Sequence, residues 1–339
     1  MLRAENDFVH WYVGGLLFGT PDLHLQAPNH AKQVQLLGAT LDHSYFIRPT
    51  FYGFFLKPLT WLPYLTSYWL YQTYSLGALL FFLWTFSRQW PDIWVYAAMS
   101  VPILSHMVNG QDVTSLLLFC TVSLLLARRN YDFLGGIVFA LCAIKFHLFI
   151  LTPFAMIAHR RWRLFAGAVV GEVALFLIGW FAGGWPVFLS LVALLRRPEN
   201  HPYPELMPNL RGMVYALSGN GQPAIYLVLC ATLSAAALYL IWTAKHYEAS
   251  LAYAIMAGLV INFHAYIQDP VLLLLCAALL FDGRESAALR TTIQLLLLPV
   301  VYILLLWRPP YSGIFGVLIL IAFSVAVRDH IRFRAVGAT

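Results

Sequence analysis

The chain has 339 residues, of which 60% are hydrophobic and only 11% are charged. Soluble domains carry about 25% charged residues, so this chain has too few charges to cover a surface exposed to water and is too apolar to stay disordered. The net charge of +6 is interpreted as membrane topology rather than nucleic-acid binding, and the composition predicts an all-α polytopic membrane protein.

The first segment, residues 1–63, is predicted to be an outer loop with interfacial helices. The stretch Phe8–Phe18, FVHWYVGGLLF, is rich in aromatic residues, and FYGFFLKPLTWLP at 51–63 is apolar but interrupted by Lys57 and two prolines. The chain begins six residues before Asp7, with no signal peptide and no leading span. A short translocated tail or a truncated or misassigned start would each account for this beginning.

Continuous apolar runs then predict about eleven transmembrane helices, in a first group at 64–183 and a second at 223–327. The runs lie at roughly 64–86, 92–107, 112–127, 132–145, 147–158, 163–183, 223–244, 250–263, 271–281, 288–306 and 313–327. Several have only about 12 to 16 residues and would reach roughly 18–24 Å, short of the ~30 Å hydrocarbon core. Flanking polar turns, or the merging of two runs into one helix, would each complete such a span.

Arginine pairs in the short loops orient these segments. Loops on one side hold 12 of the 21 Lys and Arg residues, including Arg128–Arg129 and the run HRRWR at 159–163. By the positive-inside rule these loops and the tail 328–339 face the cytoplasm, so that 1–63 and the loop 184–222 face outward. One helix over 132–158 would place the two arginine groups on opposite sides, and we therefore expect a break near Lys145.

The outer loop 184–222 is predicted to contain a second interfacial helix. It opens with Trp185–Leu195, WPVFLSLVALL, and continues with a Pro-rich stretch from Arg196 to Asn209. Long ordered loops on one side of a bundle are usually functional. The four cysteines all lie inside apolar runs and are interpreted as small core residues.

Polar residues gather at the outer ends of the predicted spans. They form turns at 109–112, 145–147, 209–211 and 262–269, while Asp7 opens the aromatic strip and Arg48 closes the first loop. Ionisable groups in spans are costly and tend to face a cavity or one another, so convergence of these turns on one outward cavity is a coherent interpretation.

Simpler interpretations of the same residues stay open. Asp7 would cap a helix, and Lys145 would extend to the interface. His147 and His264 would be core histidines, and Gln111 would tie a tight turn. Glu172, in the middle of a predicted span, is interpreted as a buried packing residue.

Seven short motifs follow one another over about residues 7–282. They are Asp7-Phe8 with the strip ending LLFG at 16–19, FIRPTFYGFFLKPLTWLP at 46–63, NGQ at 109–111, AIKFHLFIL at 143–151, RRW at 160–162, PNLRG at 208–212 and FHAYIQDPVLLLL at 263–275. In this ordered series the chain resembles the polyprenyl-phosphate-dependent membrane glycosyltransferases of the GT-C class. Within that class it is most similar to family eighty-seven, a group of mannosyltransferases and arabinofuranosyltransferases. It departs from the family at Phe146, where many relatives carry proline, and in lacking a span before Asp7.

The resemblance implies an inverting glycosyltransferase of a bacterial inner membrane with its active site facing outward. A mannose- or arabinofuranose-type sugar would pass from a polyprenyl-phosphate donor to a glycolipid or glycan acceptor, without a cofactor or a tightly bound metal. The family's motifs make Asp7 the base that takes the proton of the acceptor hydroxyl. The residues implied to bind the donor phosphate are His264, Lys145, Arg211 and Arg48. Those implied to orient the sugar or the cations are Gln111, Asp269, His147 and Tyr266.

The resemblance also predicts that Asp7 and His264 face one cavity, on the order of 7–12 Å apart. Two other functions remain open, a transporter or flippase for lipid-linked sugars and a non-catalytic membrane relative. Few membrane-embedded charges and no visible inverted halves argue against the transporter.

Overall fold

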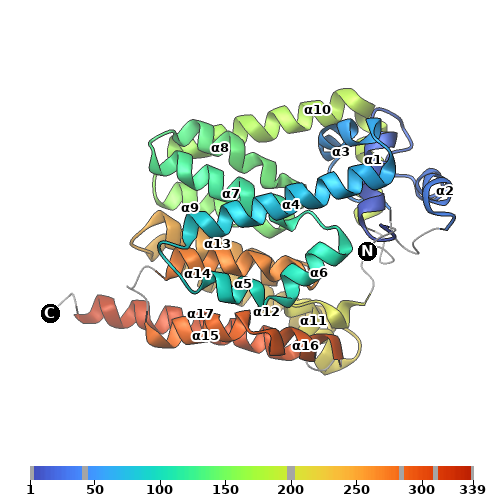
Figure 1. Ribbon diagram of the computed structural model, residues 1–339. Coiled ribbons are helices and arrows are strands. Elements are labelled where there is room, and N and C mark those ends of the chain that lie inside the picture. The colour runs from blue at the N-terminus through green and yellow to red at the C-terminus, as the bar shows by residue number, and fades with distance from the viewer. Residues whose placement is uncertain (1–3, 40–44, 197–202, 282–285, 308–311, 337–339) are drawn as a thin grey trace. The chain divides into compact units, whose positions relative to one another are not determined.

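The computed structural model describes residues 4–39, 45–196, 203–281, 286–307 and 312–336, and every regular element within these ranges is a helix (Figure 1). The predicted all-α fold is confirmed. Residues 197–202 of the predicted Pro-rich stretch, Arg308 and the last residues of the tail lie outside the described residues.

Four described helical segments are long and apolar enough to cross a membrane. They are Asp132–Phe149, Trp162–Leu195, Pro223–Thr243 and Ile314–Ile331. Two bent pairs, Val101–Asn109 with Val113–Arg128 and Ala287–Leu297 with Pro299–Trp307, raise the number to six if each pair is one span. The predicted membrane protein is thus supported by four to six candidate spans in the described chain, and the expected count of eleven is not confirmed.

Two helix breaks fall where the sequence predicts them. The helical segment η2 (Leu141–Phe149) is interrupted at Lys145, whose φ of −127° and ψ of 56° are not helical. The long helix α10 (Trp162–Leu195) is interrupted at Gly184, with φ 63° and ψ −161°. Only glycine adopts that conformation readily, so the segment that begins at Trp185 is a separate helix, as expected.

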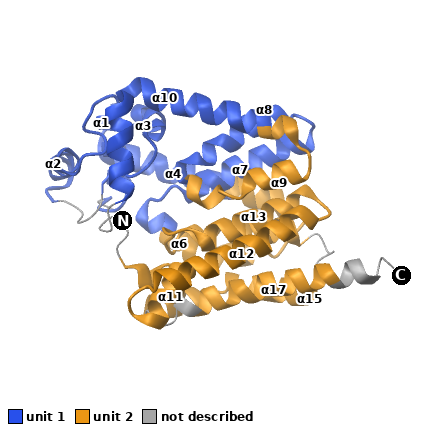
Figure 2. Ribbon diagram, turned by 180° about the vertical axis from the view of Figure 1, so that it is seen from behind, with its two compact units in different colours: residues 1–79, 106–145, 166–202 blue, residues 80–105, 146–165, 203–339 orange. Residues whose placement is uncertain are grey.

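The chain forms two compact units (Figure 2). Unit 1 comprises residues 1–79, 106–145 and 166–202. Its complete helices are α1 (Phe8–Leu17), α2 (Gln26–Leu37), α3 (Thr50–Leu56), η1 (Lys57–Trp61), α7 (Val113–Arg128) and α8 (Asp132–Ala140). It also contains most of α4 (Tyr64–Phe86), most of α10 and the end of α6 (Val101–Asn109). The aromatic strip predicted at the interface is α1, which packs on α2, α3 and η1.

Unit 2 comprises residues 80–105, 146–165 and 203–339. Its helices are α5 (Ile93–Ala98), α9 (Thr152–Ala158), η4 (Pro204–Leu206), α11 (Leu210–Ser218), α12 (Pro223–Thr243), α13 (Tyr247–Ile261), η5 (Asp269–Val271), α14 (Leu272–Leu280), α15 (Ala287–Leu297), α16 (Pro299–Trp307) and α17 (Ser312–Val336). The centre of this unit is apolar, because α14 is buried on all sides and α13 is buried from Ser250 to Val260. A helix without a polar face belongs in the middle of a bundle.

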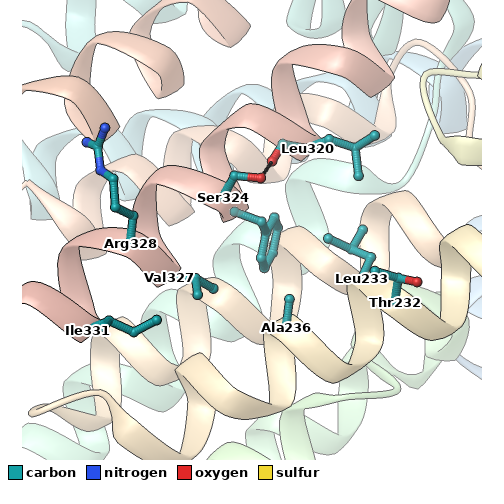
Figure 3. A pocket seen from close by; sticks show the side chains of 9 residues that line it. Thr232, Leu233, Ala236, Leu320, Ser324, Val327, Arg328 and Ile331 are labelled. Carbon is teal, nitrogen blue, oxygen red and sulfur yellow. Dashed lines mark hydrogen bonds between the residues drawn. The ribbon is translucent and has the colours of Figure 1, made fainter.

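A groove of about 620 Å³ lies between α12 and α17 of unit 2 (Figure 3). Its lining is apolar except for Thr232, Ser324 and Arg328. None of the site residues expected from the sequence lines it.

Small residues let α8 and α10 pack closely in unit 1. A Cβ atom added to Gly167 would lie 2.0 Å from the Phe133 carbonyl oxygen, and one added to Gly171 would lie 2.5 Å from Ala140 Cβ. Glycines four residues apart allow membrane helices to approach at backbone distance. The next residue, Glu172, is exposed rather than buried, so its expected packing role is wrong. Gly171 occupies the face of α10 that meets α8, and its neighbour therefore points elsewhere.

Replacing Gly167 by Ala should lower the thermal stability of the solubilised protein, since overpacking against a backbone atom costs about 1–3 kcal/mol. Gly77→Ala in α4 is the matched control, because nothing lies within 4 Å of its added Cβ. It should be neutral or stabilise by up to ~1 kcal/mol, the usual gain of Ala over Gly in a helix. Thermal unfolding in detergent measures both, and equal melting temperatures for the two variants would contradict the close packing.

His24 joins the loop after α1 to the start of α3. Its ring is 2% exposed and stacks on Phe46, with ring centroids 5.7 Å apart. Nδ1 lies 3.2 Å from the Phe46 carbonyl oxygen and Nε2 lies 3.1 Å from Thr50 Oγ1, which fits a neutral ring that donates at Nδ1. Burial lowers the pKa of His24 to about 4, although the Phe46 carbonyl opposes the shift.

Because the folded pKa of His24 lies below the ordinary value of 6.5, the unfolded chain takes up the proton first as the pH falls. The free energy of unfolding should therefore decrease between pH 6.5 and about 4, by up to roughly 3 kcal/mol from this residue. His24→Phe removes the titrating group and should flatten the dependence of stability on pH in that window. An unchanged slope in His24→Phe would show that His24 does not titrate in this way.

Candidate active site

Asp7 occupies the position before α1 but does not cap that helix. The capping bond is made by its neighbour, since Asn6 Oδ1 accepts the backbone N–H of Phe8 at 3.2 Å. The Asp7 carboxylate instead accepts a hydrogen bond at Oδ2 from Nε2 of Gln111. The Asp7 side chain is 37% exposed, so it is held at one oxygen and still open to a substrate.

The turn that carries Gln111 is pressed against α1. Gly110 has a φ of +62°, and a Cβ there would lie 3.0 Å from Phe8 Cβ. Trp11 Nε1 donates to the Gly110 carbonyl at 2.7 Å, and Tyr71 Oη donates to the Gln111 carbonyl at 3.0 Å. A glycine is required because only a residue without a side chain tolerates both the left-handed backbone and the close approach.

The next residue, Asp112, is the centre of a buried charge cluster. Arg48 Nε lies 2.6 Å from Asp112 Oδ2 and Arg48 Nη2 lies 3.2 Å from Oδ1, which makes a bidentate pair. Lys145 Nζ lies 3.3 Å from the same Oδ1. Isolated buried charges are very costly, so each member of this trio depends on the others.

The three charges come from three irregular backbone positions in unit 1. Arg48 precedes Pro49 at the start of α3, Asp112 precedes α7, and Lys145 sits at the break in η2. The Arg48 guanidinium also lies over the Trp11 ring, 4.8 Å from its centre. Lys145 is 3% exposed, so the interpretation that it extends to the interface is wrong. The trio carries two positive charges and one negative charge.

The structure shows two polar residues near Asp7 that sequence reasoning missed. His10, one turn along α1, places Nε2 3.7 Å from Asp7 Oδ1. Gln33 of α2 contacts the other nitrogen of that ring, at 3.2 Å. The i, i+3 spacing of Asp7 and His10 was a usable signal, whereas Gln33 is far away in sequence. Asp112 belongs to the polar turn 109–112, but the pattern of that turn does not indicate that it pairs with Arg48 and Lys145.

The remaining predicted residues form a second cluster, in unit 2. The rings of His147 and His264 have centroids 6.0 Å apart, and those of His264 and Tyr266 lie 4.8 Å apart. Arg211 Nη1 donates to the Phe263 carbonyl at 2.8 Å. The Asp269 carboxylate accepts the backbone N–H of Tyr266 at 2.8 Å and so shapes the turn 266–269.

The predicted residues thus gather in two groups. Asp7, Gln111, Arg48 and Lys145 lie in unit 1, and Arg211, His147, His264, Tyr266 and Asp269 lie in unit 2. The expectation that Asp7 and His264 face one cavity stays a prediction. Among the described residues, no group of three His, Cys, Asp or Glu side chains is placed to hold a metal ion.

A family model described as glycosyltransferase family 87 matches residues 46–265, nearly two thirds of the chain. The chain belongs to glycosyltransferase family 87. This GT-C-type family confirms the resemblance read from the motifs and identifies the protein as a glycosyltransferase. Together with the apolar helices, it also identifies a membrane protein. Searches of curated proteins and of solved structures gave no match.

The matched range of this family 87 glycosyltransferase includes the whole buried trio, Gln111 and His264. Asp7, Tyr266 and Asp269 lie outside the matched range. In the structure Asp7 is nevertheless joined to that range, through its bond to Gln111.

Replacing Asp112 by Asn should destabilise this glycosyltransferase by about 3–5 kcal/mol, because it leaves two buried cations without their carboxylate. Lys145→Met should cost less, since it retains the neutral Arg48–Asp112 pair. Asp329→Asn is the matched control, because the side chain of its partner Arg328 is about half exposed. Exposed pairs contribute only about 0–1 kcal/mol. Thermal unfolding in detergent ranks the three variants, and an equal loss for Asp112→Asn and Asp329→Asn would refute the central role of Asp112.

Proposed function

We propose that this glycosyltransferase takes a sugar from a polyprenyl-phosphate donor and inverts the configuration at its anomeric carbon. Asp7 is proposed to be the catalytic base. The observation that carries the proposal is the state of Asp7. Its carboxylate is not consumed in capping α1, is held at one oxygen by Gln111 and is partly exposed. A base needs this combination of fixed orientation and open access to the acceptor hydroxyl.

In the proposed reaction the acceptor oxygen attacks the anomeric carbon as the bond from that carbon to the donor phosphate breaks. The hydroxyl proton passes to Asp7, and polyprenyl phosphate leaves with the bonding electrons. Charge accumulates on the leaving phosphate, so cations in a low-dielectric site stabilise the transition state. In unit 1, Arg48 and Lys145 are the residues proposed for this role, and Asp112 holds both of them.

Gln111 is proposed to orient the sugar as well as Asp7. Its Nε2 bonds Asp7, whereas its Oε1 is buried and has no hydrogen-bond donor among the described residues. Buried acceptors rarely stay unpaired, and a hydroxyl of the bound sugar would supply the donor.

In unit 2, His264 and Arg211 are proposed to bind the donor phosphate, and His147, Tyr266 and Asp269 to support them. The ring contacts of His264 with His147 and Tyr266 favour this assignment, because they fix the orientation of its imidazole. The sugar is proposed to be of the mannose or arabinofuranose type and the acceptor a glycolipid or glycan. The active site is proposed to face outward from a bacterial inner membrane, as the loop charges indicate.

Asp7→Asn should lower kcat by at least ~10²-fold with little change in the KM for the donor, because it removes the base and keeps the shape. His264→Ala should instead raise the KM for the donor, since it removes a phosphate contact. The assay is in vitro transfer from polyprenyl-phosphate mannose and from polyprenyl-phosphate arabinose. Asp92→Asn is the matched control, because Asp92 also precedes a helix without capping it. Full activity of Asp7→Asn with both donors would refute the proposed base.

A further inference from the structure

A buried histidine lies beside the carboxylate that we propose as the base. His10 is 4% exposed, and its Nε2 is 3.7 Å from Asp7 Oδ1. Among the described residues this nitrogen is buried and has no hydrogen-bond partner. Catalytic hydrogen bonds are often long without substrate and shorten in the complex. The distance of 3.7 Å between His10 Nε2 and Asp7 Oδ1 therefore allows a hydrogen bond to form when substrate binds.

The opposite side of the ring is held by a different helix. In α2 only Asn29 and Gln33 are buried, and the Gln33 side-chain amide lies 3.2 Å from His10 Nδ1. Asn29 anchors the helix, because its Nδ2 donates to the Leu23 carbonyl at 3.0 Å and to the Leu25 carbonyl at 2.8 Å. The mostly polar helix α2 therefore places the side-chain amide of Gln33 in contact with His10.

The Gln33 contact and the nearby Asp7 carboxylate together favour one tautomer of the His10 ring. If the Gln33 amide nitrogen donates to Nδ1, the neutral imidazole has its N–H at Nε2, pointing toward Asp7. The other arrangement would place a lone pair of Nε2 against the carboxylate, which is repulsive. Electrostatics thus favours a chain of donors that runs from Gln33 through His10 to Asp7.

We propose that His10 is a positioning residue for Asp7, with Gln33 holding it in the required tautomer. His10 would hold Oδ1 while Gln111 holds Oδ2, so that the carboxylate keeps one orientation and presents its remaining lone pairs to the acceptor hydroxyl. This inference rests on the proposed function, in which Asp7 is the base. Neither His10 nor Gln33 needs to contact the substrate.

The test compares three variants in the transfer assay with the polyprenyl-phosphate sugar that the enzyme uses. His10→Phe keeps a planar ring and removes the donor, so kcat should fall at least ~10-fold with the donor KM unchanged, as expected for a misplaced catalytic group. His10→Gln retains an N–H near the position of Nε2 and should restore kcat to within about threefold of wild type. His24→Phe is the matched control, since it removes another buried histidine of unit 1 that contacts Phe46 and Thr50 instead of Asp7. It should leave kcat unchanged at neutral pH.

A double-mutant cycle with Asp7→Asn separates positioning from a general structural effect. If His10 acts through Asp7, adding His10→Phe to Asp7→Asn should cause little further loss of kcat. A full additional loss, equal losses in His10→Phe and His24→Phe, or an undiminished kcat in His10→Phe would each overturn the inference. A normal kcat in Asp7→Asn alone would instead overturn the proposed function.

Gln33 provides a second test that leaves His10 in place, should His10→Phe not fold. Gln33→Leu should lower kcat severalfold, and this effect should also disappear in the Asp7→Asn background. Gln35→Leu in the same helix is its control, because Gln35 is exposed and bonds Lys32. Equal kcat values for the two variants, with both proteins folded, would count against the donor chain.

Discussion

The site in unit 1 depends on one buried carboxylate. Asp112 has no exposed surface, and it is tolerated because Arg48 binds both of its oxygens and Lys145 binds one of them. Removing Asp112 would leave two buried cations without their carboxylate, which is strongly destabilising, whereas removing one cation would leave a neutral pair. The carboxylate thereby ties together the loop before α3, the turn before α7 and the break in η2.

The position of Asp7 follows from that constraint. Because Asp112 is held in place, the preceding residues Gly110 and Gln111 are held too, and they meet α1 through Trp11 and through Asp7 itself. The turn can come this close only because residue 110 lacks a side chain. A cluster that costs desolvation energy thus supports the placement of a partly exposed carboxylate, which the proposed chemistry requires.

The same arrangement explains why Asn6, rather than Asp7, caps α1. Asn6 Oδ1 accepts the Phe8 N–H, and Asn6 Nδ2 donates to the Val108 carbonyl. The side chain therefore caps α1 and connects it to the end of α6. An aspartate before a helix is usually interpreted as a cap. Here Asn6 caps the helix, so the Asp7 carboxylate is free of that role and can contact a substrate. This favours a functional interpretation of Asp7.

The sequence alone determined the all-α membrane class, the family and the two helix breaks, because composition, ordered motifs and the loop charges are local properties of the chain. It also pointed to Asp7, Gln111, Arg48 and Lys145. Only the tertiary structure decided that Arg48 and Lys145 share Asp112 and that Asp7 is not a cap. It also decided that His10 lies beside Asp7 and that Gln33 contacts His10. Those facts join segments far apart in sequence, such as residues 48, 112 and 145, and no local pattern records which carboxylate a cation will meet. The exposure of Glu172 likewise depends on the tertiary structure, because close packing at Gly167 and Gly171 decides which face of α10 meets α8.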